Sequence, residues 1–136
     1  MRNTVKRAAT TFLAVAFFGL IGTAAAHHSG VMFDYTKLVE LTGVVKEFQY
    51  TNPHSWLLVD VTKADGSVQT WGFEAEGPST LMRAGIRLGD LPPGTEISIR
   101  GNPMKDGRPA AAWIDAVVDG ETINPRNGFA VVPAGE

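Results

Sequence analysis

The sequence predicts an all-β fold with one short helix, namely a five-stranded barrel like that of the oligonucleotide/oligosaccharide-binding (OB) proteins. Three observations predict it. β-Branched and aromatic residues recur at strand spacing in five segments, turn-forming residues bound each segment, and a single helix signal separates the third segment from the fourth. Three strands, a helix and two strands is the order of the OB fold. An open β-sandwich is the alternative, since a single sequence does not fix the number of strands.

The first two strand signals are long. Residues 38–50 alternate apolar and polar side chains, and Gly43 within them predicts a bulge or a bend of the barrel. The turn Thr51-Asn52-Pro53 separates this segment from residues 54–63. Alternation along the second strand places Trp56 on one face and both valines on the other. The first strand is therefore expected to be curved, and the second to have one apolar face.

A hairpin turn and a short helix follow. Residues 64–67 read Ala-Asp-Gly-Ser, a sequence typical of a hairpin turn, and they lead into a third strand at residues 68–76. The helix is predicted over residues 78–84, because proline is favoured at the first helical position and Gly85 suits the left-handed cap that ends a helix. This helix is expected to seal one end of the sheet.

The last two predicted strands lie in the second half of the chain. The turn Leu91-Pro92-Pro93-Gly94 leads into a fourth strand at residues 95–101. A loop rich in turn formers, residues 102–109, separates it from a fifth strand at residues 110–118. The barrel is thereby complete with five strands.

The N-terminus has the three parts of an export signal over residues 1–26. It has a basic beginning, an apolar stretch at residues 8–21 and small residues up to Ala26. The apolar stretch is shorter than the roughly 20 residues of a retained membrane span. We therefore expect cleavage after Ala26, a periplasmic or secreted location, and no stable membrane insertion of the mature chain.

Cleavage would leave a lead-in at residues 27–37, the barrel domain at residues 38–123 and an irregular tail at residues 124–136. The leader holds three of the twelve basic residues and none of the fourteen acidic ones, so the formal charge of the remaining chain is −5. This charge disfavours nucleic acid and anionic membranes as partners, because excess Lys and Arg bind both. The chain has no cysteine, so its core must stabilise it without disulfides.

Three histidines carry the main functional hypothesis. Cleavage after Ala26 would make His27 the first residue, whose amine and Nδ1 can chelate one metal ion. A remote imidazole would complete a three-nitrogen set suited to Cu(II), and we assign that role to His54, with His28 as an alternate ligand. Three further side chains could fill an axial position: Asp34, Glu40 and Met104. The sequence thus predicts a metal-binding protein, a copper carrier or sequestering protein. The alternative is structural, with the first two histidines at a flexible chain end and His54 bonded to its own loop.

The second functional hypothesis is a binding module that needs no metal. In an OB barrel, the loop between strands one and two and the loop between strands four and five bind ligands. We expect these loops to share one rim, with Tyr50, Asn52 and His54 on the first loop and Met104 on the second. This rim would dock a periplasmic partner protein or a small ligand.

An enzyme is the least favoured interpretation. The chain has no nucleophile elbow, phosphate loop, zinc-binding helix or Cys-His pair. Glu74 and Glu76 share one strand face, a spacing typical of a solvated edge rather than of a catalytic pair. Trp56, Trp71 and Trp113 each lie in a predicted strand and are expected to fill the core.

Several motifs together resemble a known family. The N-terminal His27-His28-Ser29 and the later Asn52-Pro53-His54 occur with the Gly77-Pro78-Ser79 helix start and Asn102-Pro103-Met104. This combination is similar to a family of small exported bacterial proteins classed as a domain of unknown function, over nearly all of residues 27–119. The resemblance implies export and a compact domain, and it brings no activity or catalytic residue. In chelating geometry alone, an N-terminal histidine is also similar to the copper ligand of periplasmic copper carriers and of lytic polysaccharide monooxygenases.

Overall fold

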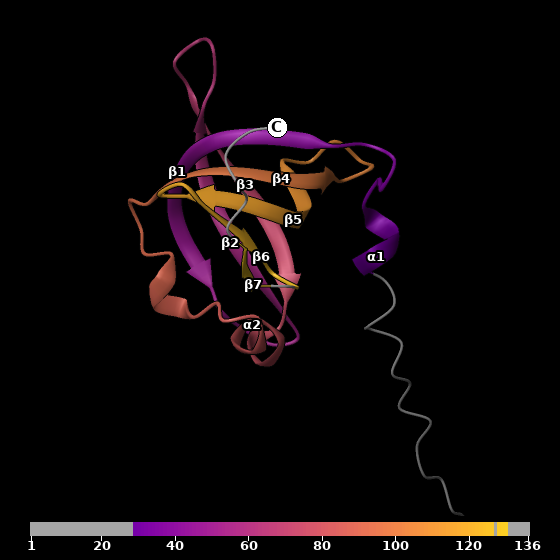
Figure 1. Ribbon diagram of the computed structural model, residues 1–136. Coiled ribbons are helices and arrows are strands. Elements are labelled where there is room, and N and C mark those ends of the chain that lie inside the picture. Colours follow the sequence, from indigo (N-terminus) through magenta and orange to yellow (C-terminus); the bar gives the residue numbers. More distant parts are fainter. Residues whose placement is uncertain (1–28, 127, 131–136) are drawn as a thin grey trace, which may run out of the picture.

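A computed structural model describes residues 29–126 and 128–130 of the chain. Its strands form one sheet in the order β3-β2-β1-β4-β5-β6-β7, and parallel pairing of β3 with β5 closes the first five into a barrel (Figure 1). The strands are β1 Val39–Gln49, β2 His54–Thr62, β3 Val68–Glu76, β4 Glu96–Pro103, β5 Ala110–Val118, β6 Glu121–Asn124 and β7 Gly128–Ala130. The helices are α1 Ser29–Met32, α2 Pro78–Arg83 and a 3₁₀ turn, Leu88–Asp90. The predicted OB-like barrel is confirmed, with α2 between β3 and β4.

The core fills the barrel as the alternation of apolar residues predicts. Along β2, Leu57 and Val59 are fully buried, whereas Trp56, the residue before Leu57, is only half-buried. The other large and fully buried side chains come from all parts of the barrel and from the helical segment: Val45, Phe73, Leu81, Ile86, Leu91, Ile97 and Ile99. Leu81 of α2 thus covers one end of the barrel, the role that the sequence predicts for this helix.

Gly43 marks a close approach between β1 and β2. A Cβ atom at this position would lie 2.4 Å from the carbonyl oxygen of Asp60, so only glycine permits the contact. The β-bulge itself lies slightly further along β1, between Val45 and Glu47. Together the close approach and the bulge allow β1 to curve and to pair with both β2 and β4.

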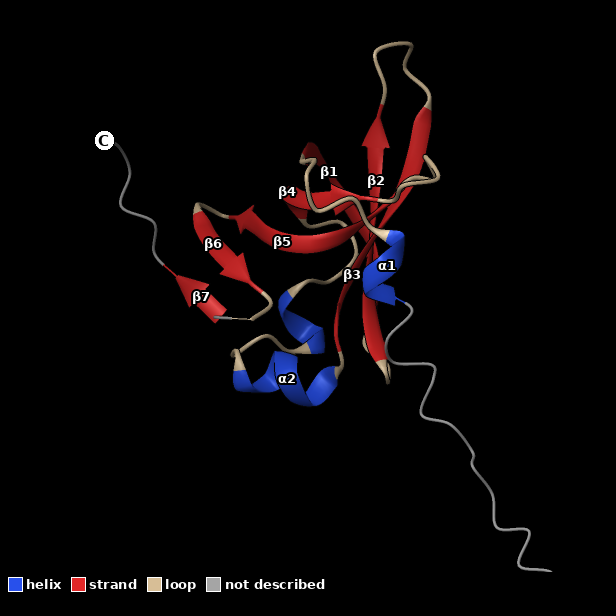
Figure 2. Cartoon of the chain, turned by 90° about the vertical axis from the view of Figure 1, so that its right-hand side faces the viewer, coloured by secondary structure: helices blue, strands red, loops and turns tan. Residues whose placement is uncertain are grey.

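The chain beyond β5 differs from the prediction. The tail from residue 124 was expected to be irregular, but Asn124 ends β6 and Gly128–Ala130 pairs with it as β7. Asp119 and Gly120 both have positive φ, which is the backbone of a tight hairpin turn, so the chain folds back directly after β5. β6 and β7 extend the sheet beside β5 (Figure 2), and Ile123 of β6 is buried.

The lead-in before the barrel is fastened to the loop between β4 and β5. Phe33 is 1% exposed and forms an isolated β-bridge with Met104. The backbone N–H of Asp34 donates to Pro103 O at 2.8 Å, and the N–H of Lys105 donates to Met32 O at 2.9 Å. These contacts fix α1 against one side of the barrel. No helix within the described residues is long and apolar enough to cross a membrane.

Candidate functional site

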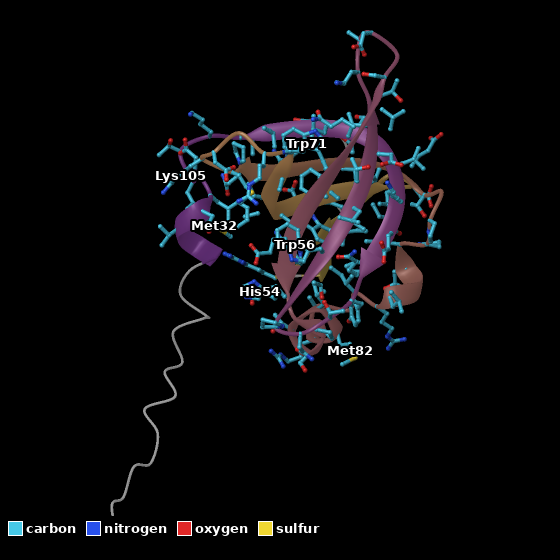
Figure 3. All side chains as sticks on the ribbon, turned by 180° about the vertical axis from the view of Figure 1, so that it is seen from behind. Met32, His54, Trp56, Trp71, Met82 and Lys105 are labelled. Atoms are coloured by element: carbon cyan, nitrogen blue, oxygen red, sulfur yellow. The ribbon has the colours of Figure 1, made fainter. Side chains whose placement is uncertain are left out.

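Three chemically distinctive side chains meet on the outer face of β2 and β3. Side chains alternate between the two faces of a strand, so Trp56 points outward because the next residue, Leu57, points into the core. His54, two residues before Trp56 and about 7 Å from it along the strand, also points outward. The antiparallel register places Glu74 of β3 directly opposite Trp56. Figure 3 shows His54 and Trp56 on this side of the molecule. We call this surface, made of His54, Trp56, Gly72 and Glu74, the β2–β3 face.

The imidazole of His54 is paired with the carboxylate of Glu74. His54 Nδ1 contacts Glu74 Oε1, and the two side chains are 27% and 10% exposed. A carboxylate accepts hydrogen bonds, so a neutral His54 donates Nδ1–H and carries its lone pair on Nε2. Within the described residues, Nε2 has no hydrogen-bond partner. The pair therefore fixes the ring and presents Nε2 for binding.

This arrangement has two chemical uses. Metal-ligating histidines characteristically donate their other ring N–H to a carboxylate, which fixes the tautomer and raises the basicity of the ligand. The same arrangement can also make Nε2 a general base. The sequence analysis treats Glu74 and Glu76 as a solvated edge. In the structure Glu76 is exposed, whereas Glu74 is partly buried. The pairing of Glu74 with His54 is the feature that the sequence analysis does not predict.

Trp56 is half-buried on the outer face because it packs against a glycine of β3. A Cβ atom at Gly72 would lie 3.2 Å from Trp56 Cε3, so the indole packs closely against the bare backbone of β3. The expectation that all three tryptophans fill the core is wrong for Trp56. It is confirmed for Trp113, which is 5% exposed, whereas Trp71 is half-buried and stacks on Phe73 with ring centroids 6.3 Å apart.

Tyr50 and Asn52, which were predicted to line the rim, lie beside α2. The Tyr50 hydroxyl donates to Ile86 O at 2.8 Å and lies 3.2 Å from Pro78 O. Burial raises the pKa of this phenol above its ordinary value. Asn52 is exposed, and its Oδ1 would be 2.9 Å from a Cβ atom at Gly77. Tyr50 thus connects the loop between β1 and β2 to the helical segment.

Two of the three predicted axial ligands, Met104 and Asp34, have contacts of their own in the lead-in and the β4–β5 loop. Met104 is 7% exposed in its β-bridge with Phe33. Asp34 accepts from the N–H and the hydroxyl of Thr36, at 3.1 and 2.6 Å, and forms an ion pair with Lys37 at 3.1 Å. These hydrogen bonds, first that of the Thr36 hydroxyl, lower the pKa of Asp34 to about 2. The carboxylate of Asp34 is therefore engaged in a local turn.

Glu40 lies far from His54 along the sheet. It is in the first part of β1, opposite Arg100, whereas the β2–β3 face adjoins the last residue of β1, Gln49. The nine residue steps from Glu40 to Gln49 correspond to about 30 Å of strand. Glu40 instead lines a polar depression with Arg100 and Asp115, whose side chains form a bidentate ion pair.

The β1–β2 and β4–β5 loops, predicted to share a rim, meet β3 at different positions. His54, the first residue after the β1–β2 loop, pairs with Glu76, and Ala110, the first residue of β5, pairs with Gly72. The loops therefore reach β3 four residues apart, or about 13 Å. Both loops thus border the β2–β3 face, and Met104 of the second loop is buried in its bridge with Phe33.

His27 and His28, the other two predicted ligands, lie outside the described residues. Within residues 29–126 and 128–130, no three or more His, Asp or Glu side chains are grouped so that they could hold a metal ion. The described part of the chain thus contributes one imidazole, held by one carboxylate. In the sequence, His28 directly precedes Ser29, the first residue of α1.

Comparison with known proteins places the chain in a family. Residues 16–112 match a family of unknown function, DUF6152. The chain belongs to this family. The match runs from the predicted leader to the beginning of β5 and includes the whole β2–β3 face. No curated protein and no solved structure matches the chain. Membership in DUF6152 agrees with the resemblance to a domain of unknown function and assigns no chemistry to His54 or Glu74.

Proposed function

We propose that this protein is exported and binds copper between its N-terminal histidine and His54. The observation that supports the proposal is the pairing of His54 with Glu74. It fixes the imidazole on an outer face and leaves Nε2 without a partner among the described residues. This is the arrangement of a histidine that ligates a metal.

The remaining ligands would come from the start of the mature chain. After cleavage following Ala26, the amine and Nδ1 of His27 form a chelate, and His54 Nε2 adds the third nitrogen of a set suited to Cu(II). α1 begins directly after His28 and lies beside the β2–β3 side of the barrel in Figures 2 and 3. The first described residues after the proposed cleavage site therefore lie on this side of the barrel, and the proposal requires His27 to reach His54 from there.

One experiment tests whether the free amine is a ligand. Cu(II) affinity is measured for the mature chain beginning at His27 and for the same chain preceded by one glycine. The chelate needs the free amine, so the extended chain should lose most of its affinity. Equal affinities of the two chains would contradict the proposal.

A second experiment tests the role of Glu74. Glu74→Gln keeps the size of the side chain but removes the charge that orients His54, and loss of such a partner typically weakens metal binding about 10–100-fold. Glu76→Gln is the matched control, because Glu76 is exposed on the same face of β3. If the two variants bind Cu(II) equally well, Glu74 does not support a metal ligand.

A docking module without metal is the second candidate, and exposed apolar residues favour it. Trp56 lies on the face that OB folds use for ligands, and three side chains of the neighbouring segment are 55–65% exposed: Val31, Tyr35 and Leu38. The proposed partner is another periplasmic protein. A pull-down from periplasm with the wild-type chain and with Trp56→Ala tests it: the partner should be enriched by the wild type alone, without bound metal. If no protein is enriched, this second candidate fails.

A further inference from the structure

The indole of Trp56 lies against the bare backbone of β3 in the middle of the β2–β3 face. A Cβ atom at Gly72 would lie 3.2 and 3.4 Å from Cε3 and Cζ3 of the ring, and 3.6 Å from Leu58 Cδ2. Trp56 and Leu58 are both half-buried on this outer side of β2, where Figure 3 shows Trp56. One side of the indole is thus supported by β3, and the exposed remainder of the ring faces away from the barrel.

The carboxylate of Glu74 has one oxygen in use and one without a partner. Glu74 stands directly opposite Trp56 in the register, and the Cβ atoms of such opposite residues are about 5 Å apart. Its side chain is only 10% exposed, and Oε1 contacts His54 Nδ1. Within residues 29–126 and 128–130, Oε2 has no hydrogen-bond partner. A largely buried oxygen that lacks a donor costs free energy, so Oε2 suits a ligand that donates a hydrogen bond.

The surroundings of Trp56 and Glu74 are acidic. Glu47 of β1 and Glu76 of β3 are exposed, and each lies one outward position along its strand from the residue opposite Trp56. None of the outward positions that adjoin Trp56 in the described strands β1, β2 and β3 is Lys or Arg. Lys46 of β1 is engaged further along the sheet, with Nζ 3.8 Å from Asp60 Oδ1. The charge of this face therefore favours a cationic ligand.

From these observations we infer that the β2–β3 face binds an arginine side chain of a partner polypeptide, with the guanidinium on the indole of Trp56 and hydrogen-bonded to Glu74 Oε2. A guanidinium is planar, stacks on aromatic faces and donates hydrogen bonds in its own plane, so one group can use the ring and the neighbouring carboxylate together. The methylene groups of the arginine would pack on Leu58.

This inference goes beyond the proposed copper site and does not depend on it. The arginine would use Trp56 and Glu74 Oε2, whereas copper would use His54 Nε2. For the docking module considered above, the inference specifies the chemistry of the partner: a basic segment that carries arginine.

Two peptides that differ only in charge test the inference. One alternates glycine and arginine. In the other, citrulline, the neutral analogue of arginine, replaces every arginine. Binding of each peptide to the mature chain is measured by titration calorimetry with EDTA present, so that metal plays no part. We expect the arginine peptide to bind at least about fivefold more tightly than the citrulline peptide. Equal affinities, or no binding of the arginine peptide, would overturn the inference.

Two variants locate the bound arginine. Trp56→Leu keeps an apolar side chain over Gly72 but removes the ring, and Glu74→Gln keeps the size of the side chain but removes its charge. Each should weaken binding of the arginine peptide at least about fivefold. Glu121→Gln is the matched control, because it removes the same charge from an exposed position on β6. If Glu121→Gln weakens binding as much as Glu74→Gln, the peptide is attracted only by the acidic chain as a whole, and the inference fails.

The copper titration of the same chain separates this inference from the proposed function. A chain that binds Cu(II) through His54 but not the arginine peptide would overturn the inference alone. A chain that binds the arginine peptide but not Cu(II) would overturn the copper site and support the inference.

Discussion

Replacing Phe33 by alanine should release the lead-in from the barrel without unfolding the barrel. Phe33 is 1% exposed in its β-bridge with Met104. Removing a fully buried phenylalanine side chain costs about 3 kcal/mol. The segment has few other attachments to the barrel. They are chiefly two backbone hydrogen bonds, from Asp34 N–H to Pro103 O and from Lys105 N–H to Met32 O. The loss should therefore appear as local opening of this segment.

Amide hydrogen exchange measures this opening directly, because it resolves single N–H groups. The amides of Asp34 and Lys105 both donate across the lead-in junction. A loss of about 3 kcal/mol corresponds to about 100-fold faster exchange at both amides. Amides inside β2 and β5 should change little. If the proposed copper site is correct, copper affinity should fall as well, because α1 would no longer be fixed against the barrel.

Tyr35→Ala is the control for this experiment, since Tyr35 lies in the same segment but is 58% exposed. Its exchange rates should match those of the wild type. Unchanged protection of Asp34 and Lys105 in Phe33→Ala would refute the reasoning. So would an equal acceleration at every amide of the barrel, because the phenylalanine would then stabilise the whole fold.

Three further predictions concern the scaffold. Gly43→Ala should lower the free energy of unfolding, measured by chemical denaturation, by more than about 2 kcal/mol. The reason is that the alanine Cβ would lie 2.4 Å from Asp60 O. A smaller loss would show that β1 and β2 separate easily. The pKa of Asp34 falls from 3.8 to about 2 on folding, so its stabilising contribution is complete above pH 3.8 and is lost as the pH falls toward 2. Asp34→Asn should remove this part of the acid dependence in melts at stepped pH, and an identical acid profile would contradict it. Tyr50→Phe should lower the free energy of unfolding by about 1 kcal/mol, because the hydrogen bond to Ile86 O is lost. Copper affinity should be unchanged. Weaker copper binding would show that Tyr50 belongs to the proposed site.

Much of the barrel could be predicted from the sequence because its strands have one apolar face. Alternation of buried Leu57 and Val59 with half-buried neighbours is what a closed barrel requires, and Gly85 has the positive φ expected of a helix cap. The β6–β7 hairpin escapes prediction because its strands have four and three residues. The Asp119-Gly120 turn is a strong hairpin sequence, but it signals only β6, which it joins to β5.

The site was predictable only in part. His54 begins β2, as the predicted second strand does, but its side chain lies on the β2–β3 face, whereas the sequence analysis assigns it to a loop rim. Register alone does not identify its partner Glu74: if Thr62 pairs with Val68 across the hairpin turn, counting outward places Glu76 opposite His54 and Glu74 opposite Trp56, one diagonal position away. The burial of the Glu74 carboxylate could not be found in this way, because it depends on the neighbouring β5, which the sequence does not place.

The lead-in shows a second limit of sequence patterns. Phe33 stands beside other apolar residues, Val31 and Met32, that are exposed, so the pattern does not identify Phe33 as the buried one. It is buried because the β4–β5 loop, some seventy residues later, offers Met104 as a bridge partner. Contacts between segments that distant are set by the closed barrel and have no local signal.

The most direct test of the proposed function is a Cu(II) titration of the mature chain, with its mass confirming His27 as the first residue, followed by electron paramagnetic resonance of wild type and His54→Ala. We predict one tight site per chain with a nitrogen-rich signal that is lost in His54→Ala. Weak binding without defined stoichiometry, or a signal that is the same in both chains, would contradict copper binding through His54.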